Sequence, residues 1–376
     1  MTILLLLLLI GCGYSYFLYP LLLRALLRHP PPQGEEPAEL PRLSVIITAY
    51  NEEERIAAKI EDTLALDYPA ERLELMVCSD ASDDATDTIV GRYADQGVRL
   101  VRATERRGKE HAQLLGIRAA QGEILVFTDV ATRIGRDSLL RLVRYFTNPQ
   151  IGAVSSEDRC LGADGRVQGE GAYVRYEMWL RGLESRAAGL VGLSGSYFAA
   201  RREICETEWD IAAPSDFNTA MACARHGLRA ISAPDILGYY PSIADERREY
   251  ARKHRTALRG MTALRRHPDF LSPRRYGLFA FQLFSHKIMR WAVPWFMLAT
   301  LLLSGAMMAG GSAFATLVFC GELAFLALAA LGALTRKLPG SARLPYYFTQ
   351  VNLALANAAV SLARGQTMVT WQPSRR

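Results

Sequence analysis

The chain has 376 residues, half of them hydrophobic, and a formal net charge of +6. This length accommodates one large domain and further segments. The excess of positive charge could indicate nucleic-acid binding, but arginines beside anionic lipid headgroups explain it more simply, so we expect no nucleic-acid partner. The six cysteines are scattered without a Cys-x-x-Cys pair, which indicates reduced thiols and argues against a disulfide framework or a zinc site.

The N-terminal segment is apolar almost without interruption from residue 3 to residue 23, which is long enough for a helix to cross a bilayer. A signal peptide is the alternative, because Leu9-Ile-Gly-Cys12 resembles a lipoprotein cleavage box. However, no Lys or Arg precedes the apolar run, and the run continues beyond this box. Arg24 and Arg28 follow it directly, so the positive-inside rule places the next segment in the cytoplasm.

After a proline-rich, polar linker at 29–41, strand and helix patterns alternate. Strands are predicted at 43–48, 73–78, 98–102, 124–128, 151–155 and 229–233. Helices are predicted at 52–65, 84–94, 108–120, 136–146, 170–190 and 216–227. This alternation predicts an α/β domain with a mostly parallel sheet that helices cover on both faces.

From about Tyr250 the sequence becomes basic and aromatic, and then apolar again. The segment 272–290 mixes apolar and cationic residues at helical spacing, as in a helix that lies in the headgroup layer or in one that packs on the soluble domain. The final apolar stretch, 346–363, contains Gln350, Asn352 and Asn357, so whether it crosses the membrane stays open. The predicted regions are a transmembrane helix at 1–28, the linker at 29–41, the globular domain at 42–265, an interfacial segment at 266–290, a membrane region at 291–363 with spans at 291–309 and 313–334, and a tail at 364–376.

Polar residues follow the first two strands at the points where they end. Thr48 closes the first strand, and Tyr50 in the turn after it could lie against a base or ribose. Glu52 begins the next helix, where it either binds a nucleoside or complements the helix dipole. Asp80 after the second strand can accept a hydrogen bond from a pyrimidine N–H or cap a helix, a role that Ser82 could also fill. In α/β sheets, nucleotides bind at this edge of the strands.

Seven motifs follow one another over roughly residues 40–260. They are Leu43 to Glu53, Cys78 to Thr86, Arg106-Arg-Gly-Lys109, Gly122 to Asp129, Gly192-Leu-Ser-Gly195, Ser215-Asp216 and Arg252-Lys-His-Arg255. In this order and spacing they resemble a family-2 glycosyltransferase with the GT-A fold. The resemblance implies a Rossmann-like nucleotide-sugar-binding domain, an inverting enzyme, and contact between Asp80 and the nucleoside of the donor.

Lys109 and Asp129 are candidates for the donor diphosphate. Lys109 precedes a helix and can approach a phosphate or the sugar, or it is solvated. Asp129 ends a hydrophobic strand, and its carboxylate is a ligand type that Mg²⁺ and Mn²⁺ prefer together with phosphate oxygens. The family usually has Asp-x-Asp here, but the second position is Ala131, so we expect a single protein carboxylate at the metal. The alternative is that Asp129 binds the ribose and cations neutralise the phosphates.

Asp216 is the candidate general base. By position alone it could equally be a helix N-cap, but the resemblance implies that it takes the proton of the acceptor hydroxyl. Ser194 lies in a tight turn where backbone can approach the sugar or the acceptor. Glu157 and Asp158 form an acidic pair at a strand end, as acceptor contacts or as solvated loop charges.

Arg252 and Arg255 are candidates for a diphosphate clamp, since guanidinium groups pair bidentately with phosphates. Processive members of the family carry Gln-x-x-Arg-Trp here; Arg255 matches, whereas Arg252 and Thr256 replace the other two residues. The missing tryptophan favours a single-sugar transferase over a polymer synthase. The other interpretation is a basic cluster that faces lipid headgroups.

We therefore expect a multi-pass protein of the inner membrane with its catalytic domain in the cytoplasm. It would transfer a sugar, with a UDP-sugar as the expected donor, to a lipid-linked or glycan acceptor in exopolysaccharide or envelope-glycan synthesis. Expected partners are the donor, the acceptor, membrane lipids and other envelope-glycan proteins. The alternatives are a processive polysaccharide synthase and a non-catalytic nucleotide-binding scaffold. All of this requires the carboxylates of Asp80, Asp129 and Asp216 to lie around one site.

Overall fold

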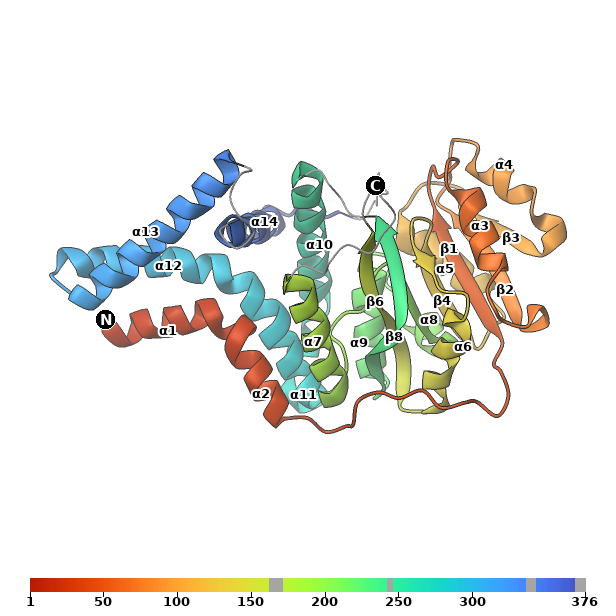
Figure 1. The fold of residues 1–376 in the computed structure, drawn as a ribbon, viewed down its shortest axis with the longest axis horizontal. Helices are drawn as coiled ribbons and strands as arrows, with labels where there is room; N and C mark the ends of the chain where they lie inside the picture. Colours follow the sequence, from red (N-terminus) through yellow and green to blue (C-terminus); the bar gives the residue numbers. More distant parts are fainter. Residues whose placement is uncertain (162–171, 242–245, 336–342, 369–376) are drawn as a thin grey trace. The chain divides into compact units, whose positions relative to one another are not determined.

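The computed structural model describes residues 1–161, 172–241, 246–335 and 343–368 (Figure 1). The chain divides into two compact units. The helical unit comprises Met1–Ala25, Asp245–Thr262 and Phe281–Thr367, and the sheet unit comprises Leu26–Ala244, Ala263–Ala280 and Met368–Arg376. Arg336 and Lys337, which follow the predicted span 313–334, and most of the predicted tail lie outside the described residues.

The sheet unit is built on eight strands in the order β3-β2-β1-β4-β7-β6-β8-β5. The strands are β1 (Leu43–Ala49), β2 (Leu73–Ser79), β3 (Val98–Arg102), β4 (Ile124–Asp129), β5 (Arg133–Ile134), β6 (Ile151–Leu161), β7 (Tyr197–Arg201) and β8 (Arg229–Pro241). The pairs β2–β3, β1–β2, β1–β4 and β6–β8 are parallel, and β7 is antiparallel to both of its neighbours. The predicted α/β fold with a mostly parallel sheet is confirmed.

Helices cover both faces of this sheet because its central strands are apolar on both sides. All seven residues of β1 are buried, and they alternate between two cores: Val45 and Ile47 face one, and Ile46 faces the other. The first core also receives residues of α3 (Ile56–Leu64), α4 (Thr86–Gly91) and α6 (Ser138–Val143). The second receives residues of α5 (Lys109–Ala119), α8 (Arg202–Thr207) and α9 (Ser215–Arg225). The helix α7 (Ala172–Ala187) completes the unit's long helices.

Among the described residues, three helical segments are long and apolar enough to cross a membrane: Thr2–Ala25, Pro273–Ala309 and Ala313–Leu334. The first contains α1 (Thr2–Gly13), a π-helical turn (Tyr14–Leu18) and α2 (Tyr19–Ala25). The others contain α11 (Pro273–Leu283), a second π-helical turn (Phe284–Ile288), α12 (Met289–Ala309) and α13 (Ala313–Leu334). The remaining long helices are α10 (Glu246–Arg266) and α14 (Leu344–Ala363).

The predicted boundary between an interfacial segment and a span at residue 290 does not coincide with a helix end. The helical stretch runs on from α11 through the π-helical turn into α12, and its backbone departs from helical geometry only at Gly277, where φ is 52°. α14 has 20 residues but is not among the candidate spans, so its crossing of the membrane stays open.

Candidate active site

The carboxylates of Asp80 and Asp129 lie at the same edge of the sheet, on the two sides of β1. Thr48 of β1 is paired with Asp129 at the end of β4. On the other side Ala49 is paired with Ser79, and the Asp80 N–H donates to the Ala49 carbonyl at 2.9 Å. Parallel strands end at the same edge of a sheet, so β2, β1 and β4 bring their last residues together there.

Asp80 holds the loop that leads into α5. Its side chain is completely buried, and its two oxygens accept the backbone N–H groups of Arg107 at 2.9 Å and of Gly108 at 2.9 and 3.0 Å. Burial raises the pKa of Asp80, although these N–H donors oppose the shift. The alternative that Asp80 caps the following helix is wrong, because Ala85 occupies the N-cap position of α4. Contact between Asp80 and a nucleoside remains a prediction.

The turn after β1 carries an aromatic ring covered by a cation. The Arg106 guanidinium lies over the Tyr50 ring, 3.8 Å from its centroid, so one face of this ring is already occupied. The next residue, Asn51, has a left-handed backbone with φ of 52°, a conformation that Asn tolerates better than most residues. Arg106 was not predicted as a site residue, although it opens one of the motifs listed above.

Thr48 and Glu52, both predicted to contact the donor, are buried. The Thr48 side chain is enclosed within the sheet, and the structure exposes no part of it. Glu52 accepts a hydrogen bond from Arg55 Nε at 2.9 Å, and its backbone N–H donates to Thr86 Oγ1 at 2.8 Å. Burial raises the pKa of Glu52, and Arg55 opposes this shift. Glu52 therefore joins α3 to α4, and its contact with a donor stays a prediction.

Lys109 links the Asp129 carboxylate to the turn before β7. As the first residue of α5, it places its ammonium 2.5 Å from Asp129 Oδ1 and 2.8 Å from the Gly195 carbonyl oxygen. Its side chain is 9% exposed and that of Asp129 is 26% exposed. The Asp129 N–H donates to the Ser196 carbonyl at 3.0 Å, so the turn at 193–196 is also fixed to the end of β4.

The same turn binds Asp158, a predicted acceptor contact. Asp158 Oδ1 accepts hydrogen bonds from Ser194 Oγ at 2.6 Å and from Ser196 Oγ at 3.1 Å. The predicted residues Ser194 and Asp158 are therefore in contact with each other. Glu157 beside them is half-buried and lies 3.2 Å from the Arg159 guanidinium; burial raises the pKa of Glu157. Direct contact of these residues with an acceptor stays a prediction.

Asp216 lies beside this turn at the start of α9. A methyl group built on Gly195 would stand 3.7 Å from Asp216 Oδ2, and the Leu193 N–H donates to the Asp216 carbonyl at 3.3 Å. The N-cap alternative is wrong, because Pro214 occupies the cap position. Asp216 and Lys109 thus both adjoin Gly195, one on its α-carbon side and one on its carbonyl.

Glu110 supports the base candidate and was missed by the sequence analysis. It is buried, and its Oε1 accepts the backbone N–H of Ser215 at 3.3 Å, directly before Asp216. Together, Lys109 and Glu110 connect the start of α5 to both Asp129 and the start of α9. The only signal in the sequence is that a glutamate follows Lys109. The sequence does not show whether such a glutamate is buried or solvated.

Lys59 was also missed, but a signal for it exists. In α3 the inward side chains are Ile56, Lys59, Ile60 and Thr63, which follow the spacing of one buried helix face. A lysine within this stripe is unusual, because lysines are almost never fully buried unless they are paired. Its ammonium donates to Thr128 Oγ1 at 3.0 Å and to the Thr132 carbonyl at 2.6 Å, on the two sides of Asp129.

Arg252 and Arg255 lie on α10, in the part of this helix that belongs to the helical unit. Arg252 forms a bidentate pair with Glu249, with both nitrogen–oxygen distances at 2.7 Å. Burial lowers the pKa of Arg255. A diphosphate clamp built from these arginines remains a prediction.

The site suits a metal ion only if the donor supplies most of the ligands. Among the described residues, no group of three His, Cys, Asp or Glu side chains could hold a metal. Asp129 Oδ1 is bound to Lys109, whereas Oδ2 has no hydrogen-bond partner within the described part of the chain, and the side chain is partly exposed. Mg²⁺ and Mn²⁺ commonly bind through one or two carboxylates plus substrate phosphates and waters. One Asp129 oxygen and a diphosphate therefore fit such an ion.

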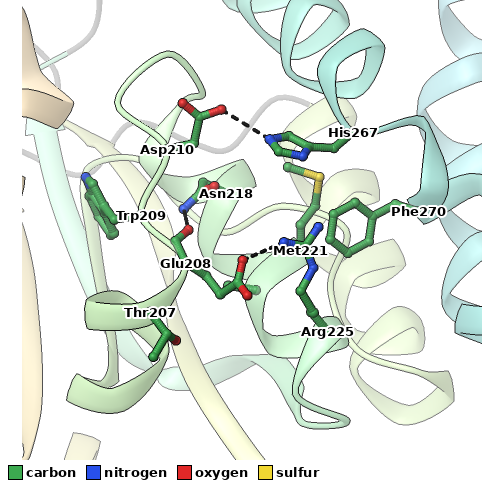
Figure 2. A pocket seen from close by; sticks show the side chains of 10 residues that line it. Thr207, Glu208, Trp209, Asp210, Asn218, Met221, Arg225, His267 and Phe270 are labelled. Carbon is green, nitrogen blue, oxygen red and sulfur yellow. Dashed lines mark hydrogen bonds and ion pairs between the residues drawn. The ribbon is translucent and has the colours of Figure 1, made fainter.

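A separate cavity of about 210 Å³ lies between the α8–α9 segment and residues 267–270 (Figure 2). Its charged groups are paired with one another: Glu208 with Arg225 at 2.5 Å, and Asp210 with His267 at 3.2 Å. None of the predicted site residues is among the residues that line it. We therefore do not assign the transfer reaction to this cavity.

Comparison with known proteins agrees with this geometry. Residues 44–209 match the model of the glycosyl transferase family 2, and they include Asp80, Lys109 and Asp129. This part of the chain is a glycosyl transferase family 2 domain. A mannosyltransferase from Pyrobaculum calidifontis, solved with GDP-Man and Mn²⁺, aligns with 96% of this glycosyltransferase and 98% of its own chain, at 27% identity and a TM-score of 0.75. That likeness confirms the predicted GT-A fold.

Curated relatives match shorter parts of the glycosyltransferase. A β-monoglucosyldiacylglycerol synthase of Trichormus variabilis is 26% identical over 181 residues, which are 46% of this chain and 39% of the relative. A poly-β-1,6-N-acetyl-D-glucosamine synthase of Staphylococcus epidermidis is 29% identical over 119 residues, 31% of this chain and 28% of the relative. The chain thus spans less than half the length of these relatives. They support a transferase enzyme.

Proposed function

We propose that this glycosyltransferase transfers one sugar, with inversion, from a nucleotide-sugar to a lipid-linked or glycan acceptor at the cytoplasmic face of the inner membrane. The observation that carries the proposal is a set of hydrogen bonds: Lys109 binds both Asp129 and the Gly195 carbonyl, and the Leu193 N–H of the same turn donates to the Asp216 carbonyl. It joins a candidate diphosphate site at the end of a parallel strand to a carboxylate that can serve as a base.

On the donor side, the diphosphate would lie against Lys109 and Asp129, and the nucleoside along the edge formed by Tyr50 and Asp80. Lys109 is well placed for this because its ammonium is largely desolvated, and charge interactions are stronger away from water. A UDP-sugar, the donor expected from the sequence, is the first one to test. Arg252 and Arg255 are proposed as further phosphate contacts.

Mg²⁺ or Mn²⁺ would be held by Asp129 Oδ2 and the donor phosphates. When bound, such an ion offsets the negative charge of the departing nucleoside diphosphate. The mannosyltransferase relative was solved with Mn²⁺, which supports use of a divalent ion. In this chain Lys109 already neutralises one oxygen of Asp129, so the lysine and the ion would act on the same carboxylate from different sides.

Asp216 would remove the proton from the acceptor hydroxyl as that oxygen attacks the anomeric carbon opposite the leaving group. Glu110 and the Leu193 N–H hold the backbone around Asp216, so the position of the base follows from α5 and the 193–196 turn. Gly195 carries no side chain between this carboxylate and Lys109. The acceptor hydroxyl would enter beside the turn, near Ser194, Asp158 and Glu157.

The membrane context supports an acceptor that stays in the bilayer. Among the described residues, three segments can cross a membrane by length and composition; Arg24 lies at the end of the first of them, and Arg28 follows it. By the positive-inside rule the sheet unit is then cytoplasmic. Two relatives are named for synthesis of a glycolipid and of a polysaccharide. Other proteins of envelope-glycan synthesis are proposed partners.

The test is to measure nucleotide release and sugar transfer by the purified full chain with a panel of UDP-sugars and GDP-Man, with Mn²⁺, Mg²⁺ or EDTA. We expect turnover of a UDP-sugar with a divalent ion. Asp216→Asn should abolish transfer while the Kd for UDP stays within about twofold, because the base acts only in the chemical step. Asp137→Asn, at a half-exposed aspartate in the N-cap position of α6, is the control.

Equal transfer by Asp216→Asn and the wild type would refute the base assignment. Binding of UDP without turnover of any donor would favour the scaffold interpretation. Turnover of GDP-Man alone would keep the transferase and the site but replace the proposed donor.

A further inference from the structure

Lys59 is a buried cation that the proposed mechanism does not use. It lies on α3, and its side chain is only 4% exposed, between the core residues Ile56 and Ile60. An apolar residue would continue the inward face of this helix. The fold of α3 therefore provides no reason for a lysine at this position.

The ammonium of Lys59 ties together the two ends of the turn that carries Asp129. It donates to Thr128 Oγ1 at 3.0 Å and to the Thr132 carbonyl oxygen at 2.6 Å. Within that turn the Thr132 N–H donates to the Asp129 carbonyl at 3.1 Å. Asp129 thus lies on a short loop closed by its own backbone hydrogen bond and by the lysine.

No carboxylate hydrogen-bonds to Lys59 within the described ranges, so its charge is not neutralised by direct contact. Burial lowers its pKa to about 8, and the negative charge of Asp129 opposes that shift, so Lys59 is mostly charged at neutral pH. Burying an ammonium without a contacting counter-ion is unfavourable. A charge kept at a cost to stability is expected where the charge serves a site.

Lys109 and Lys59 approach the Asp129 turn from different elements. Lys109, at the start of α5, binds the Asp129 carboxylate itself. Lys59, on α3, binds the residue before Asp129 and the residue three positions after it. Since Ala131 stands where the Asp-x-Asp pattern has a second carboxylate, Asp129 is the only carboxylate that the turn offers to a metal ion.

We propose that Lys59 is a positioning residue, which fixes the Thr128–Thr132 turn so that Asp129 is held in place for the donor diphosphate and its metal ion. This inference rests on the proposed function of Asp129. Lys59 touches no substrate; it acts through the turn and through its charge beneath Asp129.

The test compares three single variants in the full-length protein. Lys59→Met keeps the length of the side chain but removes the charge and the donors. Lys59→Gln keeps an N–H donor without the charge. Thr63→Ala is the matched control: Thr63 is buried one turn further along α3 and donates to the Lys59 carbonyl at 2.7 Å, away from the Asp129 turn. The readouts are the Kd of UDP with Mn²⁺ by calorimetry, the thermal midpoint, and kcat with the best donor.

We expect Lys59→Met to raise the Kd of UDP with Mn²⁺ at least tenfold and to lower kcat, with a thermal midpoint equal to or above that of the wild type. Lys59→Gln should recover part of this loss. Thr63→Ala should lower the thermal midpoint and leave the Kd within about twofold. Should Lys59→Met fold poorly, Lys59→Gln decides the question alone, with a threefold or greater rise in Kd as the expected result.

The inference is overturned if both Lys59 variants bind UDP with Mn²⁺ like the wild type. It is also overturned if the Lys59 variants lose both affinity for UDP and thermal stability, and Thr63→Ala shows the same two losses. Failure of the proposed function is separate: it appears in the wild type, as an absence of binding to any nucleotide in the panel.

Discussion

Replacing Lys109 by methionine removes the ammonium that contacts Asp129 and the Gly195 carbonyl. We expect this variant to lose about 100-fold or more in kcat/KM, and Asp129→Asn to lose a similar factor. The informative quantity is the coupling between the two changes. If the ion pair acts as one unit, the second substitution should cause little further loss of kcat/KM once the first has been made.

The size of this coupling follows from distance and burial. At 2.5 Å the gross Coulomb energy is about 7 kcal/mol at an effective dielectric constant of about 20, and desolvation of both groups offsets most of it. Exposed pairs contribute up to about 1 kcal/mol, whereas breaking a buried pair costs about 3–5 kcal/mol. Lys109 is 9% exposed and Asp129 26%, so we expect an intermediate coupling. We take about 2 kcal/mol, or about 30-fold.

The assay is a double-mutant cycle on kcat/KM at saturating Mn²⁺, with Arg118→Met, at an exposed cation on the same helix α5, as the control. Two independent 100-fold losses would multiply to about 10,000-fold, and a coupling of about 30-fold reduces this to about 300-fold. A double variant that shows the full product within about twofold would refute the interaction between Lys109 and Asp129 in the reaction.

Three further changes test other contacts of the site. Glu110→Met removes the acceptor of the Ser215 N–H, so kcat should fall about tenfold while the Kd of UDP is unchanged; an altered Kd with normal kcat would contradict its role beside the base. Asp158→Ala removes the acceptor of the hydrogen bond from the Ser194 hydroxyl, so the KM for the acceptor should rise about tenfold at constant donor KM. A rise in the donor KM alone would show that Asp158 serves the donor instead. Because burial raises the pKa of Asp80, the folded protein takes up a proton there before the unfolded chain does. The wild type should therefore gain stability relative to Asp80→Asn as pH falls from 7 towards the ordinary aspartate range near 4, as measured by urea unfolding. If the difference in unfolding free energy between the two proteins does not change with pH, burial of the Asp80 charge is refuted.

Most of the sheet could be predicted from the sequence because its central strands are short apolar runs buried on both faces. Leu43–Ala49 and Ile124–Asp129 begin at the predicted residues and end one residue later. The strand Tyr197–Arg201 was not predicted, since its small Ala199 and Ala200 resemble neither an alternating nor a β-branched strand. The predicted helix at 52–65 starts only at Ile56, because residues 53–55 form a turn in front of it.

The site was only partly predictable because its contacts depend on pairings that sequence spacing does not reveal. Asp80 and Asp129 could be placed at one edge, since parallel strands end there. The meeting of Lys109, Gly195 and Asp216 requires the antiparallel strand β7, which was not foreseen. The sequence does not show whether a charged residue such as Glu110 or Lys59 is buried or solvated. Only Lys59 could have been recognised as buried, because it lies in an apolar stripe of its helix.

The reversed direction of β7 has a consequence for engineering acceptor choice. In its antiparallel neighbour β4 the last residue of the strand, Asp129, lies at the site edge, but in β7 the residues before the strand lie there. A mutant library aimed at new acceptors should therefore randomise the stretch upstream of Tyr197 rather than the one downstream of Arg201. Insertions after Arg201 would emerge at the opposite rim, where the chemistry should tolerate them.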